Sequence, residues 1–457
     1  MKETIRIASG QGFWGDLPNA PIKQVKNGPI DYLVMDYLAE VTMSIMQKQK
    51  MRNADYGYAR DFVGVIEAIL PEIAGQGIKV VSNAGGVNPG ACKDALLKII
   101  NEQGYDNIKV AVVDGDDILS NIDSLIDQGH HLENMESGEP VETVKDELLS
   151  ANVYFGSKPI VEALKKEADI VITGRVTDTG LTLGPMIHEF GWSFDDYDKM
   201  AAGTIAGHII ECGAQVSGGN FTDWEKVDDF TDIGFPIIEA KADGSFYVTK
   251  HDGTGGLVSE MTVKEQLLYE IGDPAEYITP DCIADFTTVH LEPAGNDRVK
   301  VFGIKGRPDT PTYKVSASYN DGFKLSSTLV YSWPKALKKA QKAGEILKNR
   351  ADALDLTFDE FRVEYVGLNG ANETPITDKE LAQEHDEIQM RVSVSGQSKD
   401  DLNRFGKEIA PLILTGPSGV TGFAGGRPKA SGIVAYWPAL LDKEAVEPRV
   451  RIFESKN

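Results

Sequence analysis

Cysteine is scarce in this sequence. Of 457 residues only three are cysteines, Cys92, Cys212 and Cys282, and none belongs to a CxxC pair. Three widely separated cysteines argue against a disulfide framework, and against a zinc or iron–sulfur site built on thiolates. We therefore predict neither a bound metal nor a bound cofactor.

Long apolar runs and positive charge are also scarce. No stretch of about 18 apolar residues occurs, and the opening MKETIRIASG lacks the apolar segment of a signal peptide. A cytoplasmic protein without a membrane span is expected. Asp and Glu number 70 against 46 Lys and Arg, a net charge of −24. Such a surface repels nucleic acids and anionic membranes, so neither is predicted as a partner.

The first half of the chain alternates between strand and helix patterns. Expected strands are 4–9, 78–81, 108–113, 153–155 and 169–173, and expected helices are 30–51, 61–74, 91–103 and 159–168. This alternation is typical of βαβ units, which form parallel sheets covered by helices on both faces. We predict an N-terminal α/β domain over residues 1–275 with a mostly parallel sheet.

Ligands of open α/β sheets bind beyond the carboxyl ends of the strands. That rule nominates four loops, 10–15, 82–90, 114–117 and 174–180, and predicts that 82–90 and 174–178 lie together at one edge. The loop at 82–90 has neither GxGxxG nor GxxxxGK[ST] spacing, so no dinucleotide cofactor is predicted. The alternative is that Asn-Pro-Gly simply turns the chain. The candidate substrate-binding residues here are Ser82, Asn83, Gly85, Gly86, Arg175 and Asp178.

The middle of the chain carries polar residues between glycines. His208, Glu211 and Cys212 share one face of an expected helix over 201–215. A His and a Glu so placed suit acid–base chemistry, and the alternative is a buried, hydrogen-bonded structural pair. We predict an active site from this face and the segments 217–223 and 251–256. Its catalytic candidates are His208, Glu211, His251 and Asp223, with Asn220 and Thr254 binding substrate.

The pattern changes in the last third of the chain. Consecutive strands are expected at 286–291, 298–304, 313–319 and 323–331, then helices and strands in alternation. This predicts a C-terminal α+β domain with an antiparallel sheet over residues 276–457. The glycine-rich segment 415–429 contains Arg427 and Lys429, which are candidates for binding a carboxylate or phosphate. The alternative is a flexible surface loop.

Several longer motifs resemble the acyclic terpene utilisation (AtuA-like) family. They are ASGQGFWGD, DYLVMDYLAEVTMSI, SNAGGVNP, TGRVTD, GHIIECGAQVSGGNFTDW, HDGTGGLVS, KEQLLYEIGDPAEYITPD and GRPKASGIVAYWPALL, and they extend from Thr4 to Leu441. The resemblance implies catabolism of branched isoprenoid acids carried as coenzyme A thioesters. The ferredoxin-like extension of some relatives is not evident, so a role that needs it requires a separate small ferredoxin-like subunit.

Three functions compete. The first is a lyase that adds or removes water on an acyl-CoA or hydroxyacid substrate through acid–base chemistry. The second is a hydrolase or acyl transferase that uses Cys212 or a serine, although no GxSxG motif occurs. The third is a non-catalytic acyl-binding scaffold. Exposure of His208 and Glu211 to a pocket would favour the enzymes, and burial of both among side chains would favour the scaffold. We also predict a homo-oligomer, formed through helix 201–215 or helix 30–51.

Overall fold

The computed structural model describes residues 2–372, 375–422 and 426–455. The chain forms two compact units, one made of Met1–Ser318 with Tyr436–Asn457 and the other of Tyr319–Ala435. This division does not coincide with the expected boundary at 275/276, because two later strands join the first sheet. These strands are β11 (His290–Pro293) and β12 (Arg298–Phe302).

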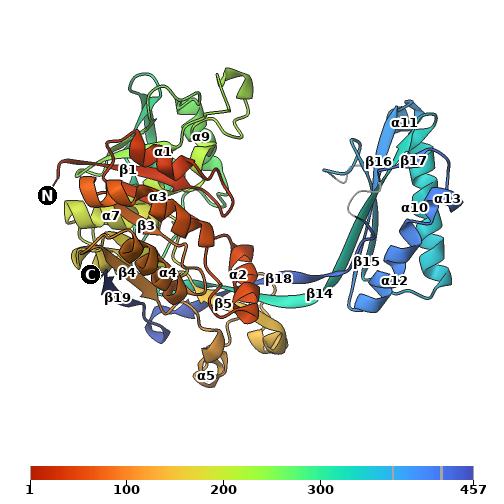
Figure 1. The fold of residues 1–457 in the computed structure, drawn as a ribbon, viewed down its shortest axis with the longest axis horizontal. Coiled ribbons are helices and arrows are strands. Elements are labelled where there is room, and N and C mark those ends of the chain that lie inside the picture. Colours follow the sequence, from red (N-terminus) through yellow and green to blue (C-terminus); the bar gives the residue numbers. More distant parts are fainter. Residues whose placement is uncertain (1, 373–374, 423–425, 456–457) are drawn as a thin grey trace. The chain divides into compact units, whose positions relative to one another are not determined.

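A mixed sheet organises the first unit, with a parallel centre between antiparallel edges (Figure 1). The parallel strands are, in spatial order, β1 (Thr4–Gln11), β2 (Tyr32–Met35), β3 (Lys79–Ser82), β6 (Ile170–Thr173) and β4 (Lys109–Asp114). Antiparallel β7 (Pro236–Lys241), β8 (Phe246–Lys250), β12 and β11 extend it beyond β1, and β19 (Arg449–Glu454) extends it beyond β4. The predicted α/β class is confirmed.

Helices cover both faces of the parallel strands. Leu33, Val80 and Ile170 point into a core shared with α3 (Arg60–Gln76) and α4 (Pro89–Glu102). The alternate residues Val34, Val81 and Val171 are also buried, and the other face carries α6 (Lys158–Lys165), α7 (Gly180–Phe190) and α8 (Tyr197–Glu211). Burial on both sides explains why the central residues of these strands are mostly apolar.

The helix predicted over 30–51 is wrong. Residues Tyr32–Met35 form β2, and a helix, α2 (Glu40–Arg52), begins only after a short connection. All four residues of β2 are buried, so the strand lacks the alternation that marks a half-exposed strand. A short apolar run of this kind does not distinguish a central strand from a buried helix.

The second unit contains an antiparallel sheet, as predicted. Its strands are β14 (Thr312–Ser332), β15 (Glu360–Val366), β16 (Glu387–Gly396), β17 (Val420–Thr421) and β18 (Ser431–Asp442), in the order β15-β16-β14 with β17 and β18 paired to β14. With α10 (Ala336–Ala353) and α12 (Lys399–Ile409), the chain order β14-α10-β15-β16-α12-β18 is the βαββαβ arrangement of ferredoxin-like folds. The strands expected at 313–319 and 323–331 are one continuous strand, because Asp321-Gly322 does not turn the chain.

The remaining elements connect these layers. They are α1 (Ala20–Lys26), α5 (Ile122–Asp127), β5 (Leu148–Val153), α9 (Glu260–Leu268), β9 (Tyr277–Ile278), β10 (Ile283–Asp285), β13 (Lys305–Arg307), α11 (Asp378–Ala382) and α13 (Leu412–Thr415). Within the described ranges, no helix has the length and apolar character needed to cross a bilayer.

Candidate functional site

The carboxyl ends of the parallel strands bring the predicted loops to one edge of the sheet. Because β3 and β6 pair in parallel, the segments 82–90 and 174–178 lie side by side, which confirms that prediction. Gly85 is needed for this approach, since a Cβ atom there would lie 2.5 Å from the carbonyl oxygen of Thr173. The edge therefore gathers polar groups from several strands, as the strand-end rule requires.

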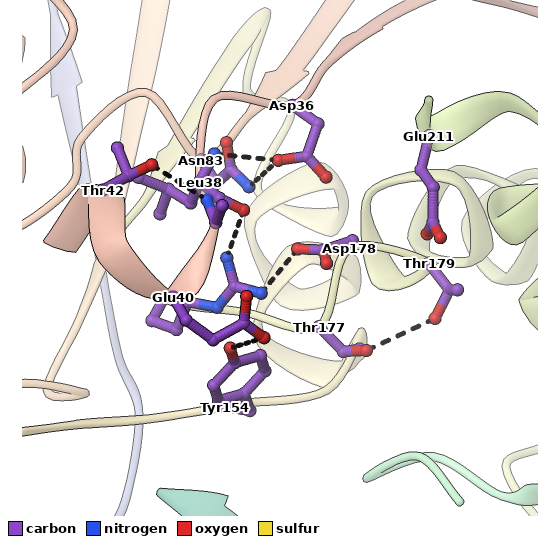
Figure 2. Close-up of polar contacts among 12 residues, drawn as sticks. Asp36, Leu38, Glu40, Thr42, Asn83, Tyr154, Thr177, Asp178, Thr179 and Glu211 are labelled. Carbon is purple, nitrogen blue, oxygen red and sulfur yellow. Dashed lines mark hydrogen bonds and ion pairs between the residues drawn. The ribbon is translucent and has the colours of Figure 1, made fainter. Parts of the chain in front are cut away.

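Asp36, the residue directly after β2, is the centre of this edge (Figure 2). Its side chain is buried, and its Oδ1 accepts a hydrogen bond of 2.7 Å from Nδ2 of Asn83. The amide oxygen of Asn83 in turn accepts from the backbone N–H of Tyr37 at 2.7 Å. Asn83, a predicted substrate-binding residue, is itself fully buried and orients Asp36.

Arg175 joins the loop after β6 to the loop after β2. Its side chain is 1% exposed; Nη1 donates to the carbonyl oxygen of Leu38 and Nη2 to Oδ1 of Asp178, both at 2.8 Å. The guanidinium carbon lies 4.0 Å from the ring centroid of Tyr154, a cation–π contact. Tyr154 donates a hydrogen bond to Glu40 at 3.2 Å, as Figure 2 shows. Arg175 is therefore a buried residue that joins the two loops. A third of the Asp178 side chain is exposed, so Asp178 is the solvent-accessible member of the cluster.

Burial and mutual repulsion change the acidity of these carboxyl groups. Burial raises the pKa of Asp36 to about 6, although Arg175 and Asn83 oppose the rise. Burial also raises the pKa of Asp178 well above its ordinary value; Arg175 opposes this rise, and the neighbouring Asp36 carboxyl adds to it. A carboxyl group with a raised pKa holds its proton to higher pH than an exposed Asp or Glu does, which suits a general acid.

Glu211, at the end of α8, extends the cluster. The pKa of Glu211 is raised by burial and also by the charge of Asp178. Its Oε1 lies 3.1 Å from Nδ1 of His208, and its Oε2 is buried with no hydrogen-bond partner in the described structure. Figure 2 shows the Glu211 side chain directed toward Thr179, in the loop that carries Asp178. Glu211 therefore belongs to both the predicted helix face and the strand-end cluster.

His208 lies behind Glu211. It is 2% exposed, its ring packs edge-on against Tyr277 and Phe286, and its Nε2 lies 2.9 Å from the carbonyl oxygen of Gln266. A carbonyl only accepts, so Nε2 carries a hydrogen. Burial lowers the pKa of His208, but its bond to Glu211 more than compensates and the pKa is raised overall. His208 thus supports Glu211 from inside the fold.

Three residues of the cluster are absent from the sequence prediction, namely Asp36, Glu40 and Tyr154. Asp36 directly follows a short apolar run, as Asn83 does, and this position predicts a residue at the end of a strand. The sequence pattern over 30–51 also fits a helix, and that expectation hides the end of the strand at Asp36. Asp116, from the predicted loop 114–117, supports Arg175: its Oδ2 accepts from the Arg175 backbone N–H at 2.8 Å and from Asn152 at 2.9 Å. Burial raises the pKa of Asp116 to about 7.

The other residues predicted in the loop 82–90 and in the segment 217–223 form no described hydrogen bond with the side chains of the carboxyl cluster. Ser82 is buried and donates to the carbonyl oxygen of Met35 at 2.8 Å, and Gly86 has a positive φ of 51°. Asn220 is exposed. Asp223 is exposed as well and forms an ion pair with Lys226.

His251 and Thr254 line a separate pocket beside α1. The segments 217–219 and 255–257 do meet, since the backbone N–H of Leu257 donates to Ser217. Arg427 and Lys429 are exposed residues of the second unit. The part of the segment at 423–425 lies outside the described residues.

Metal and cofactor chemistry can be tested against the same geometry. In the described part of the chain no three His, Cys, Asp or Glu side chains are grouped so that they could hold a metal ion. The segment Gly10–Gly15, which begins in the last residues of β1, has GxGxxG spacing. However, α1 begins only at Ala20, and a Cβ at Gly12 would lie 2.7 Å from the backbone of Cys212 and Gly213. This glycine allows helix α8 to pack closely, and the loop does not open onto a helix N-terminus as a dinucleotide loop does.

Comparison with known proteins adds a family assignment. A family model described as acyclic terpene utilisation family protein AtuA matches residues 5–452. Comparison with curated proteins and with solved structures finds no match.

Proposed function

The chain belongs to the acyclic terpene utilisation family, and from this premise we propose that it is a catabolic enzyme for branched, isoprenoid-type acyl-CoA thioesters or hydroxyacids. Membership of the family fits a role in acyclic terpene catabolism. The proposed reaction is the addition or removal of water by acid–base catalysis, with the reaction centre at the carboxyl cluster Asp36, Asp178 and Glu211.

One observation carries this proposal: the three carboxyl groups with raised pKa values meet where parallel strands end. Removal of water from a hydroxyacyl group needs a base and an acid. A carboxylate takes the proton from the carbon next to the carbonyl, and a protonated carboxyl donates its proton to the departing hydroxyl. The products are an unsaturated acyl group and water, so the cluster ends with the same number of protons.

The charge of the cluster indicates which part of a substrate it suits. Asp36, Glu40, Asp178 and Glu211 surround a single buried cation, Arg175, whose Nη atoms are already bonded within the fold. An anionic group would be repelled here unless the carboxyls were protonated. The neutral reacting carbons of a thioester or hydroxyacid therefore fit this position better than the phosphates of a carrier.

The thiol alternative gains no support. Burial and the charge of Glu211 raise the pKa of Cys212 to about 12. The nucleophile of a thiol enzyme is the thiolate, which this environment disfavours. The burial of His208 and of the Glu211 carboxyl group favours a scaffold without chemistry. The enzyme is supported instead by Asp178, which is partly exposed and lies among other carboxyl groups that repel it.

The predicted homo-oligomer and the separate ferredoxin-like subunit remain proposals, and the second unit already gives this chain a ferredoxin-like arrangement of its own. Helix α8 is buried within its own unit from Met200 to Ile210, so its small apolar residues offer no surface to a partner. Helix α2 exposes Val41, Ile45 and Met51, with Met51 72% exposed. We therefore favour α2 for self-association; light scattering at micromolar concentration would show a dimer or larger, and a monomer mass would contradict it.

Mass spectrometry of purified protein with a substrate panel tests the reaction directly. The panel contains branched 3-hydroxyacyl-CoA thioesters, their unsaturated counterparts and the free hydroxyacids. A gain or loss of one water from a branched thioester or hydroxyacid is expected. Release of free coenzyme A would support the hydrolase instead, and binding without conversion would support the scaffold.

A further inference from the structure

A pocket lies beside α1, outside the carboxyl cluster. It has a volume of about 150 Å³ and is lined by α1 with the residues before it, by the segment that leads into β7, and by His251 and Thr254. Leu17, Ala20, Ile233 and Phe235 supply its apolar surface. A protein cavity of about this size accommodates benzene, a molecule of six carbon atoms.

The polar groups of this pocket are almost all committed to the fold. Nε2 of Gln24 donates to the carbonyl oxygens of Ser9 and Pro236 at 2.9 and 3.1 Å. The hydroxyl of Thr254 donates to the carbonyl oxygen of His251 and accepts from the buried Lys250 at 3.1 Å. At the rim, a further pair of side chains, Lys23 and Asp232, neutralise each other at 2.8 Å.

His251 has a ring nitrogen that is not used in this way. Its side chain belongs to a residue only 8% exposed, and Nε2 lies 2.9 Å from the carbonyl oxygen of Gln24, so Nε2 carries the hydrogen. Burial lowers the pKa of His251, which keeps the ring neutral and leaves a lone pair on Nδ1. Within the described structure Nδ1 has no hydrogen-bond partner, and it is not among the atoms sealed from solvent. The buried residues of the pocket thus hold two acceptor atoms without a described partner, Nδ1 of His251 and Oε1 of Gln24, and Nδ1 is the one on an aromatic ring.

We infer that this pocket binds a small neutral molecule with a branched apolar body and a single hydrogen-bond donor, such as an alcohol, which donates to Nδ1 of His251. The apolar body contacts Leu17 and Phe235. A carboxylate has no hydrogen to donate, and its negative charge is repelled by the lone pair on Nδ1 of His251. An ether of the same shape also has no hydrogen to donate, so it leaves Nδ1 without a hydrogen bond. Binding here is independent of turnover at the carboxyl cluster, so the two sites succeed or fail separately.

Nuclear magnetic resonance of the full chain with ¹⁵N-labelled histidine tests this site. The probes are 3-methylbutan-1-ol, its methyl ether and 3-methylbutanoate at pH 7.5. The alcohol should shift the Nδ1 resonance of His251 in a saturable way, and the other two should shift it at least tenfold less at equal concentration. His251→Phe identifies the resonance by its loss.

Leu17→Trp should fill the mouth of the pocket and abolish the shift, whereas Leu414→Trp, on an exposed leucine of the second unit, should not. If His251→Phe does not fold, Leu17→Trp identifies the site. No shift with the alcohol, equal shifts with all three probes, or a shift that survives Leu17→Trp would overturn the inference.

Discussion

The Nδ1 atom of His208 and the Oε1 atom of Glu211 lie 3.1 Å apart, so a hydrogen bond between them requires one proton on one of the two atoms. The other ring nitrogen donates to Gln266, so the pair is either a neutral imidazole with a protonated carboxyl or an imidazolium with a carboxylate. Oε2 of Glu211 has no partner in the described structure. The Glu211 carboxyl group can therefore donate a proton to the carboxyl cluster when it is protonated, and accept one when it is a carboxylate.

This geometry makes His208 a positioning residue for Glu211. His208 lowers the pKa of Glu211 against the effect of burial. His208→Gln should therefore move the rising limb of the pH–rate profile to higher pH and reduce turnover at pH 7 by about tenfold, the effect of one pH unit. Kinetics between pH 5 and 9 measure both. An unchanged profile with full turnover would show that the pair is only structural.

Two buried carboxyls predict how stability depends on pH. The pKa values of Asp36 and Asp116 in the fold, about 6 and about 7, lie above those of an unfolded Asp. The folded state therefore holds more protons between pH 4 and 7, and the contribution of these groups to stability falls as pH rises, by up to about 1.4 kcal/mol per pH unit for each.

Asp116→Asn removes one of these groups while keeping an acceptor. The free energy of unfolding of this variant, relative to the unchanged chain, should increase from pH 4 to pH 8. Denaturant unfolding at several pH values measures the difference. A difference that stays constant with pH would contradict the raised pKa of Asp116.

The loop after β3 can lie close to the end of β6 only because residue 85 is glycine. A Cβ there would meet the Thr173 oxygen at 2.5 Å and Pro89 at 2.9 Å, so Gly85→Ala should cost about 1–3 kcal/mol of stability. Gly90→Ala is the matched control, because nothing lies within 4 Å of its Cβ position in α4, and it should be neutral or stabilising. Equal unfolding free energies for the two variants would refute the packing argument.

Cys212 should be dispensable for chemistry. With its thiol pKa raised to about 12, the thiolate is nearly absent at neutral pH. Cys212→Ala should retain turnover within about threefold, and the unchanged protein should resist alkylation by iodoacetamide at pH 8. A loss of two or more orders of magnitude would restore the thiol hypothesis.

The edge of the sheet could be predicted from the sequence, and the central carboxyl group could not. Strand-then-glycine patterns placed the loops at 82–90 and 174–178 correctly, because parallel pairing forces strand ends together. Asp36 was missed because β2 is four buried apolar residues, a pattern that fits either a strand or a helix. Its importance depends on Asn83 and Arg175, which are distant in sequence.

The other differences between the predicted and the observed site arise because the sequence does not show where each side chain points. The spacing of His208 and Glu211 correctly predicted contact between them, but a helical pattern does not say which of the two faces the core. The pattern around Asp223 gave no indication that Lys226 would pair with it at the surface. The division of the chain into two units could not be predicted from the sequence. It depends on the pairing of β12 with β8, and of β11 with β12, and these contacts join segments that are distant in the chain.

Turnover of Asp178→Asn on the substrate identified by mass spectrometry tests the central claim most directly. Asp178 is the open member of the cluster, and loss of a general acid or base costs on the order of 10²–10⁴ in rate. We expect a loss of that size for Asp178→Asn at a temperature where the variant is still folded, and none for Asp195→Asn, an exposed carboxylate elsewhere. If folded Asp178→Asn keeps the rate of the Asp195→Asn control, the carboxyl cluster is not the site of acid–base chemistry.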